Sequence, residues 1–70
     1  MSHWHYQLMK HTTPDDEYVY YGVHEYYELE TGPAWTENLV TVDGESIDDI
    51  RKMLINILKD LDTHGVKDYE

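Results

Sequence analysis

A single amphipathic segment, residues 46–65, most constrains the fold that this chain can adopt. Its apolar residues recur at intervals of three and four, which is the pattern of an α-helix with one buried face. One such helix can cover only one side of a small sheet. The apolar stripe consists of Ile47, Ile50, Leu54, Ile57, Leu58 and Leu61.

Sequence signals mark both ends of this helix. Ser46 is a good N-cap, and Asp49, three residues later, completes a capping pair. Gly65 suits the left-handed backbone of a helix C-cap. We expect the apolar stripe to belong to the core, so replacing Leu54 with alanine should cost about 2–5 kcal/mol of stability.

Three segments ahead of the helix have the composition of β-strands. Residues 3–12 alternate between two faces, residues 17–29 are rich in tyrosine and valine, and residues 35–42 end in alternating valines. Turn residues separate them, with Pro14 in the first gap and Gly32 in the second. The predicted fold class is α+β: a three-stranded antiparallel meander followed by one amphipathic helix packed on one sheet face (β-β-β-α).

The chain is expected to form one small domain over residues 1–66, with residues 67–70 as a flexible C-terminal tail. A chain of 70 residues builds only a thin core. It rarely has room for a buried, preorganised active site. Contact with another protein, or with a second copy, would bury surface that one copy cannot bury by itself.

The predicted helix leaves one sheet face bare, and strand alternation assigns side chains to the two faces. The covered face takes Tyr6, Leu8, Val19, Tyr21, Val23, Val40 and Val42. The bare face takes His3, His5, Gln7, Met9, Tyr18, Tyr20, His24, Tyr26, Trp35, Glu37 and Leu39. Glu25 falls on the covered row, so either a bulge near Gly22 shifts the register or Glu25 lies beyond the covered part of the sheet.

The bare face is rich in rings that carry a hydroxyl or a nitrogen at the rim. Tyrosine and tryptophan concentrate at the centres of protein interfaces, and an exposed patch of them marks a contact site. The alternative is that the tyrosines only strengthen cross-strand pairs. We expect a non-catalytic protein-protein interaction module that binds a protein partner or itself, as a homodimer, through this face or a strand edge. Ile55, outside the helix stripe, is a second and weaker sign of association, and the alternative is a lone surface apolar residue without a role.

The charge balance limits the partners. Fifteen acidic side chains and five basic ones give a net charge of −10, which disfavours nucleic acid and anionic membranes and permits a basic protein partner. An acidic inhibitor that covers a basic nucleic-acid-binding surface is therefore the alternative function. The chain has no cysteine, no apolar run of membrane length and no secretory signal pattern, so we expect a cytoplasmic protein.

Histidines are the residues most able to carry chemistry here. His3, His5 and His24 share one predicted face, which permits a Zn²⁺ or Ni²⁺ site, but no zinc motif spacing is present. His24 and Glu37 could form an acid–base pair, yet no nucleophile, phosphate loop or cofactor motif accompanies them. We therefore expect no catalysis, no metal and no cofactor. His24 could instead tune a contact with pH.

Four segments together resemble a family of short bacterial and phage-associated proteins of no established activity: WHYQLM, YYGVHEYYE, WTEN and GESIDDIRKML. Members share W-x-Y, Y-x-[IV]-H-E-x-Y-Y, W-T-E, and G-E-S before an acidic-led helix, over nearly the whole chain. Their usual ending resembles PVLD, where this chain has GVKD at residues 65–68. The resemblance implies a shared surface at His24, Glu25, Trp35, Thr36 and Glu37.

The β-β-β-α order with its G-E-S helix entry also resembles the HicB-type antitoxin domain, a partial RNase H-like fold. Antitoxins of that type often carry a separate DNA-binding segment, which is not expected here, and a fold by itself does not confer a function. The bare face and the family resemblance together predict these partner-binding residues: Tyr18, Tyr20, His24, Glu25, Tyr26, Trp35, Thr36 and Glu37.

Overall fold

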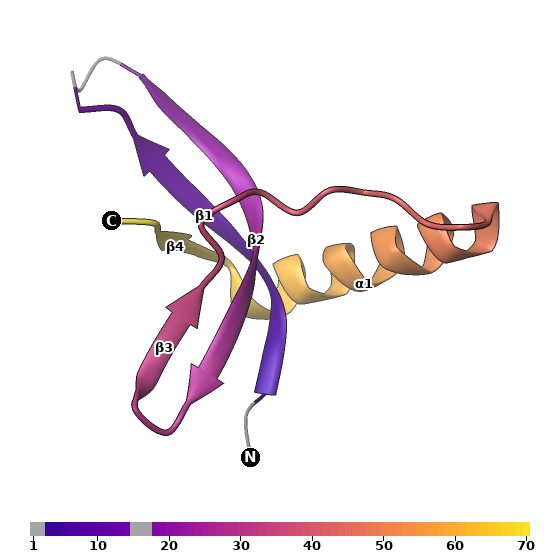
Figure 1. The fold of residues 1–70 in the computed structure, drawn as a ribbon. Coiled ribbons are helices and arrows are strands. Elements are labelled where there is room, and N and C mark those ends of the chain that lie inside the picture. Colours follow the sequence, from indigo (N-terminus) through magenta and orange to yellow (C-terminus); the bar gives the residue numbers. More distant parts are fainter. Residues whose placement is uncertain (1–2, 15–17) are drawn as a thin grey trace.

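The computed structural model describes residues 3–14 and 18–70. Its elements are, in chain order, β1 (His3–Thr12), β2 (Val19–Leu29), β3 (Gly32–Trp35), α1 (Ile47–His64) and β4 (Val66–Asp68). The strands form one sheet in the order β3-β2-β1-β4 (Figure 1). The α+β class and its single helix are confirmed, but the sheet of the described residues is mixed and four-stranded, because β4 pairs with β1 in parallel.

β1 and β2 form a long antiparallel hairpin that pairs without interruption over all 10 residues of β1. The register runs straight through Gly22, so the described pairs contain no bulge there. A Cβ on Gly22 would lie 2.1 Å from Cδ2 of Leu39, so the Leu39 side chain packs directly on this part of the backbone. The turn predicted around Pro14 falls largely on residues 15–17, outside the described residues.

β3 lies earlier in the chain than predicted. The sequence placed a third strand over residues 35–42, whereas β3 ends at Trp35. A two-residue loop connects β2 to β3, and the φ of 120° at Gly32 is one that glycine adopts readily. The chain then stays beside β2, where the N–H of Val40 donates to the carbonyl of Val23 at 2.8 Å, before a long loop leads out to α1 (Figure 1).

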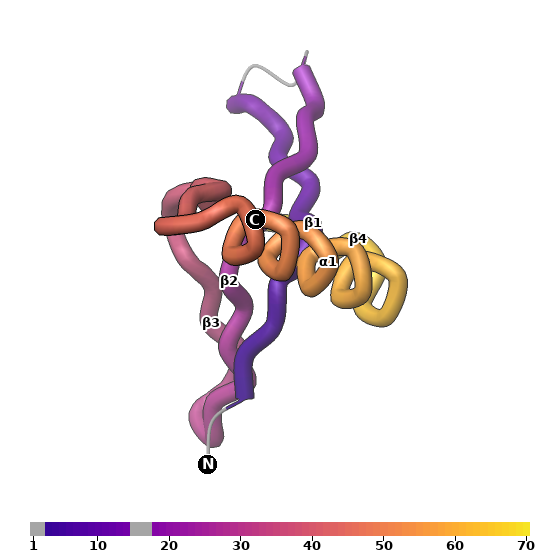
Figure 2. The backbone as a smooth tube through the Cα atoms, turned by 90° about the vertical axis from the view of Figure 1, so that its right-hand side faces the viewer, coloured from indigo at the N-terminus to yellow at the C-terminus, as the bar shows by residue number. Residues whose placement is uncertain are grey.

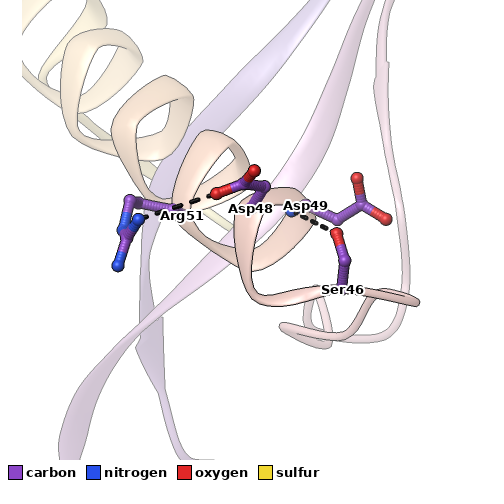
Figure 3. Close-up of polar contacts among 4 residues, drawn as sticks. All are labelled: Ser46, Asp48, Asp49 and Arg51. Atoms are coloured by element: carbon purple, nitrogen blue, oxygen red, sulfur yellow. Dashed lines mark hydrogen bonds and ion pairs between the residues drawn. The ribbon is translucent and has the colours of Figure 1, made fainter.

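The two ends of α1 confirm the predicted caps. The side chain of Ser46 accepts a hydrogen bond from the backbone N–H of Asp49 at 3.1 Å, and an exposed ion pair of 3.6 Å joins Arg51 to Asp48 beside it (Figure 3). At the other end Gly65, with a φ of 65°, donates its N–H back to the last turn at 3.0 Å. These local signals fix the length of the helix.

β4 was not predicted from the sequence. Residues 67–70 were expected to form a flexible tail, but β4 pairs with residues 8–10 of β1, and the N–H of Tyr69 donates to the carbonyl of Lys10 at 3.0 Å. Parallel pairing requires a long connection, and α1 lies within it. The last residues of the chain therefore extend the sheet.

The buried face of the sheet is the one predicted to be bare. The prediction was wrong because β3 and the residues that follow β4 bring rings onto it: the Tyr69 ring stacks on His11 with centroids 4.3 Å apart, and Trp35 stacks on Tyr26 at 5.8 Å. Leu39 covers Gly22 on the same face. The side chains buried there are His5, Gln7, Met9, His11, His24 and Tyr26.

α1 covers little of the opposite face. It crosses the strands steeply, with its C-terminal end against β1 and its N-terminal end pointing away from the sheet (Figures 1 and 2). On that face Tyr6, Leu8 and Val23 are half-buried, whereas Val19 and Tyr21 are exposed. Leu54 was predicted to be core and is also exposed, so its predicted cost of substitution does not apply to a single protomer.

Candidate protein-binding surface

α1 exposes part of its apolar stripe, together with Ile55 outside the stripe. Ile47 is 75% exposed, Leu58 is 60% exposed, and Leu54 and Ile55 are each 49% exposed. At 100° per residue, Ile47, Leu54 and Leu58 fall within about 40° of one another around the helix axis, and Ile55 lies about 60° beyond Leu58, with Arg51 and Asp62 at the angles between. We call the surface that carries these four exposed apolar side chains the outer flank of α1.

The other side of the stripe contacts the protomer's own chain. Ile50, Met53, Ile57 and Leu61 are half-buried, and no side chain of α1 is fully buried in the described structure. The carboxylate of Asp60 accepts a hydrogen bond of 2.9 Å from the backbone N–H of Tyr6, which ties the helix to β1. The stripe is thus wider than the sheet can cover, and the outer flank is the remainder.

Further apolar side chains are exposed on the sheet and on the loop that precedes α1. Trp4 and Tyr21 are exposed on the sheet face that carries Tyr6, and Leu39 and Val42 are exposed on the loop that leads to α1. A hollow of about 500 Å³ separates that loop from α1, with Glu25 from β2 and Met53 from α1 among its lining residues. The protomer therefore leaves an unfilled space between its helix and its loop.

A tyrosine–carboxylate cluster lies on the sheet face that carries Tyr6. The hydroxyl of Tyr27 donates a hydrogen bond to the Glu25 carboxylate, and this bond raises the pKa of Tyr27. Burial, with repulsion from Glu25 and Asp60, raises the pKa of Tyr6. Both pKa shifts are in the direction that favours the neutral phenol, so Tyr6 and Tyr27 are neutral hydrogen-bonding groups beside the carboxylates.

The predicted partner-binding residues do not share one exposed face. Tyr18, Tyr20 and Glu37 are exposed, and Glu25, Trp35 and Thr36 are half-buried. His24 and Tyr26 are buried, so the expectation that they lie on a bare surface was wrong. The structure does bring His24 to Thr36, whose carbonyl oxygen lies 2.8 Å from Nδ1 of His24.

A histidine pair lies at the centre of the buried face. Nε2 of His11 and Nε2 of His24 are 2.7 Å apart. Because the Thr36 carbonyl can only accept, Nδ1 of His24 carries its hydrogen, and a neutral His24 then presents a bare Nε2 to the N–H of His11. Burial lowers the pKa of His24, an effect that the Thr36 carbonyl opposes and His11 adds to. The pair is suited to a neutral interior.

The described histidines are not arranged as the metal site that the sequence permitted for His3, His5 and His24. His5 lies 2.9 Å from the side-chain oxygen of Gln7 and stacks on His64, while His24 pairs with His11. Over residues 3–14 and 18–70, no three histidine or acidic side chains gather closely enough to hold a metal ion. Within the same ranges, no helix has the length and apolar character needed to cross a membrane.

Comparison with protein-family models, curated proteins and solved structures gave no match to this chain. The two resemblances drawn from the sequence therefore stay predictions. Sequence reasoning missed the outer flank because it assigned the whole stripe, including Ile47, Leu54 and Leu58, to the core and set only Ile55 apart from it. It missed the part that Tyr69 plays because no pattern connects that residue to β1.

Proposed function

We propose that this protein is a non-catalytic protein-interaction module whose contact surface is the outer flank of α1. One observation carries the proposal: Ile47, Leu54, Ile55 and Leu58 are all exposed on the chain's only helix in the described structure. Exposed apolar patches of this kind mark interaction sites on small proteins. Trp4 and Tyr21 are further exposed rings, on the sheet.

The charge supports a second candidate, an acidic inhibitor of a basic nucleic-acid-binding protein. The net charge of −10 would steer the chain toward a basic surface. A complex formed in that way should weaken steeply as salt is added, because screening acts on exposed charges. A complex formed through the apolar outer flank should instead change little with salt, which separates the two candidates.

Photocrosslinking in the cells that naturally make the protein tests the proposal. A benzophenone amino acid replaces Leu58, on the outer flank, or Asn56, on the opposite side of the same helix. We expect a crosslinked protein adduct from position 58 that position 56 does not give, and the mass of the adduct identifies the partner. Equal labelling at both positions, or none, would contradict the proposed surface.

A further inference from the structure

We infer that the partner of the outer flank is a second copy of this chain, so that two α1 helices pack together across a two-fold axis. This inference rests on the proposed function and names the partner for the same surface. It differs from the homodimer predicted from the sequence, which would form through the tyrosine-rich sheet face or a strand edge. In the structure much of that sheet face is buried inside the protomer.

The surface area of the protomer is larger than that of a self-sufficient monomer. It exposes 5455 Å², whereas a folded monomer of 8.4 kDa exposes about 4600 Å². The excess of about 850 Å² is close to the roughly 800 Å² that each partner contributes to an interface of standard size. Burying one interface of standard size would therefore reduce the exposed area of the protomer to about that of an ordinary folded monomer of this mass.

The dimensions lead to the same conclusion. The Cα radius of gyration is 13.3 Å, compared with about 11 Å for a compact domain of this length. α1 contributes to the difference, because its N-terminal end projects from the sheet (Figures 1 and 2). A helix standing out in this way has room for a neighbour along its outer flank.

The charge distribution favours a second copy over a basic partner at this surface. α1 carries four acidic and three basic side chains, for a net charge of −1, so the rest of the chain carries −9. Two copies would repel one another least if they met along α1. A strongly basic partner would be drawn elsewhere, to the acidic surface outside the helix.

The outer flank is also compatible with pairing to itself. In an antiparallel pair of helices related by a two-fold axis, each contact occurs twice, with the roles of the two copies exchanged. Setting Ile47 of one copy level with Leu58 of the other brings Asp48, in the acidic first turn, within a few ångströms along the axis of Lys59. Apolar side chains then meet at the centre and opposite charges meet at the edges.

Sedimentation equilibrium of the purified full chain, from about 1 to 100 µM, tests the inference. We expect a mass of twice 8.4 kDa for the native sequence. Leu58→Glu should raise the dimer dissociation constant on the order of 100-fold or more, because a two-fold dimer buries the unpaired carboxylate twice. Asn56→Glu adds the same charge on the opposite side of α1 and should leave the dimer intact.

Folding controls keep this test decisive. Circular dichroism checks that α1 survives in each variant, and Ile47→Glu serves as a second outer-flank variant because an acid in the first turn suits the helix dipole. A native dimer that both outer-flank variants leave intact would overturn the inference.

A folded native monomer would also overturn it, and the crosslinking result then decides the proposed function. If position 58 captures a different protein, the proposed function stands without self-pairing. If position 58 captures nothing, both fail.

Discussion

Replacing Met9 with alanine tests where the core lies. Met9 is 0% exposed at the centre of the buried face, whereas the sequence placed the core under the helix stripe at Leu54. Truncating a fully buried methionine leaves a cavity and costs about 2–5 kcal/mol. A domain of this length has only about 4–10 kcal/mol of stability, so Met9→Ala should remove a large part of it.

Leu54→Ala is the matched comparison. Leu54 is already half exposed in a protomer, so its truncation should cost only about 1 kcal/mol, since full burial of such a side chain is worth about 1.5–3 kcal/mol. Urea unfolding followed by circular dichroism, at protein concentrations low enough to keep the chain monomeric, measures both changes. Equal losses of stability, or a larger loss for Leu54→Ala, would refute the assignment of the core to the buried face of the sheet.

Three further predictions concern the same buried face and the helix cap. Burial lowers the pKa of His24 below the ordinary 6.5 or so of an unfolded histidine, so the stability that the neutral His24 contributes should be fully present above about pH 6.5 and should be lost as the pH falls through the lower pKa of the folded state. The urea midpoint should show this loss of stability at low pH. His24→Asn should make the loss smaller, and the exposed-site control His3→Gln should leave it unchanged. Tyr69→Ala should uncover His11 and lower the thermal midpoint, and an unchanged midpoint would show that the ring does not cover the face. Ser46→Ala should cost about 1 kcal/mol in urea unfolding through the lost cap, and no change would mean that the cap bond is not formed in solution.

Local features of the fold could be predicted from the sequence. The strand over residues 3–12 follows from period-two alternation, and the helix follows from its stripe and from the caps at Ser46 and Gly65. Such signals lie within a few residues of one another in the chain. They specify each element without reference to the rest of the molecule.

The packing of the elements could not be predicted in the same way. Which sheet face is buried depends on β4, a strand of three residues that is too short to show alternation. It also depends on Tyr69, which reaches His11 from the far end of the chain. The stripe of α1 predicts that the helix packs against something, but it cannot say that the chain's own sheet covers only one side of it.

Dipolar electron spin resonance on a single nitroxide at Asn56→Cys tests most directly whether α1 is the contact between two copies. The chain has no other cysteine, so each copy carries one label, placed away from the outer flank. We expect a dipolar modulation with one dominant distance, because two labels are present only when two chains associate, and we expect Leu58→Glu in the labelled chain to abolish it. The absence of modulation, or a modulation that Leu58→Glu leaves unchanged, would contradict the assignment of the outer flank of α1 as the self-association surface.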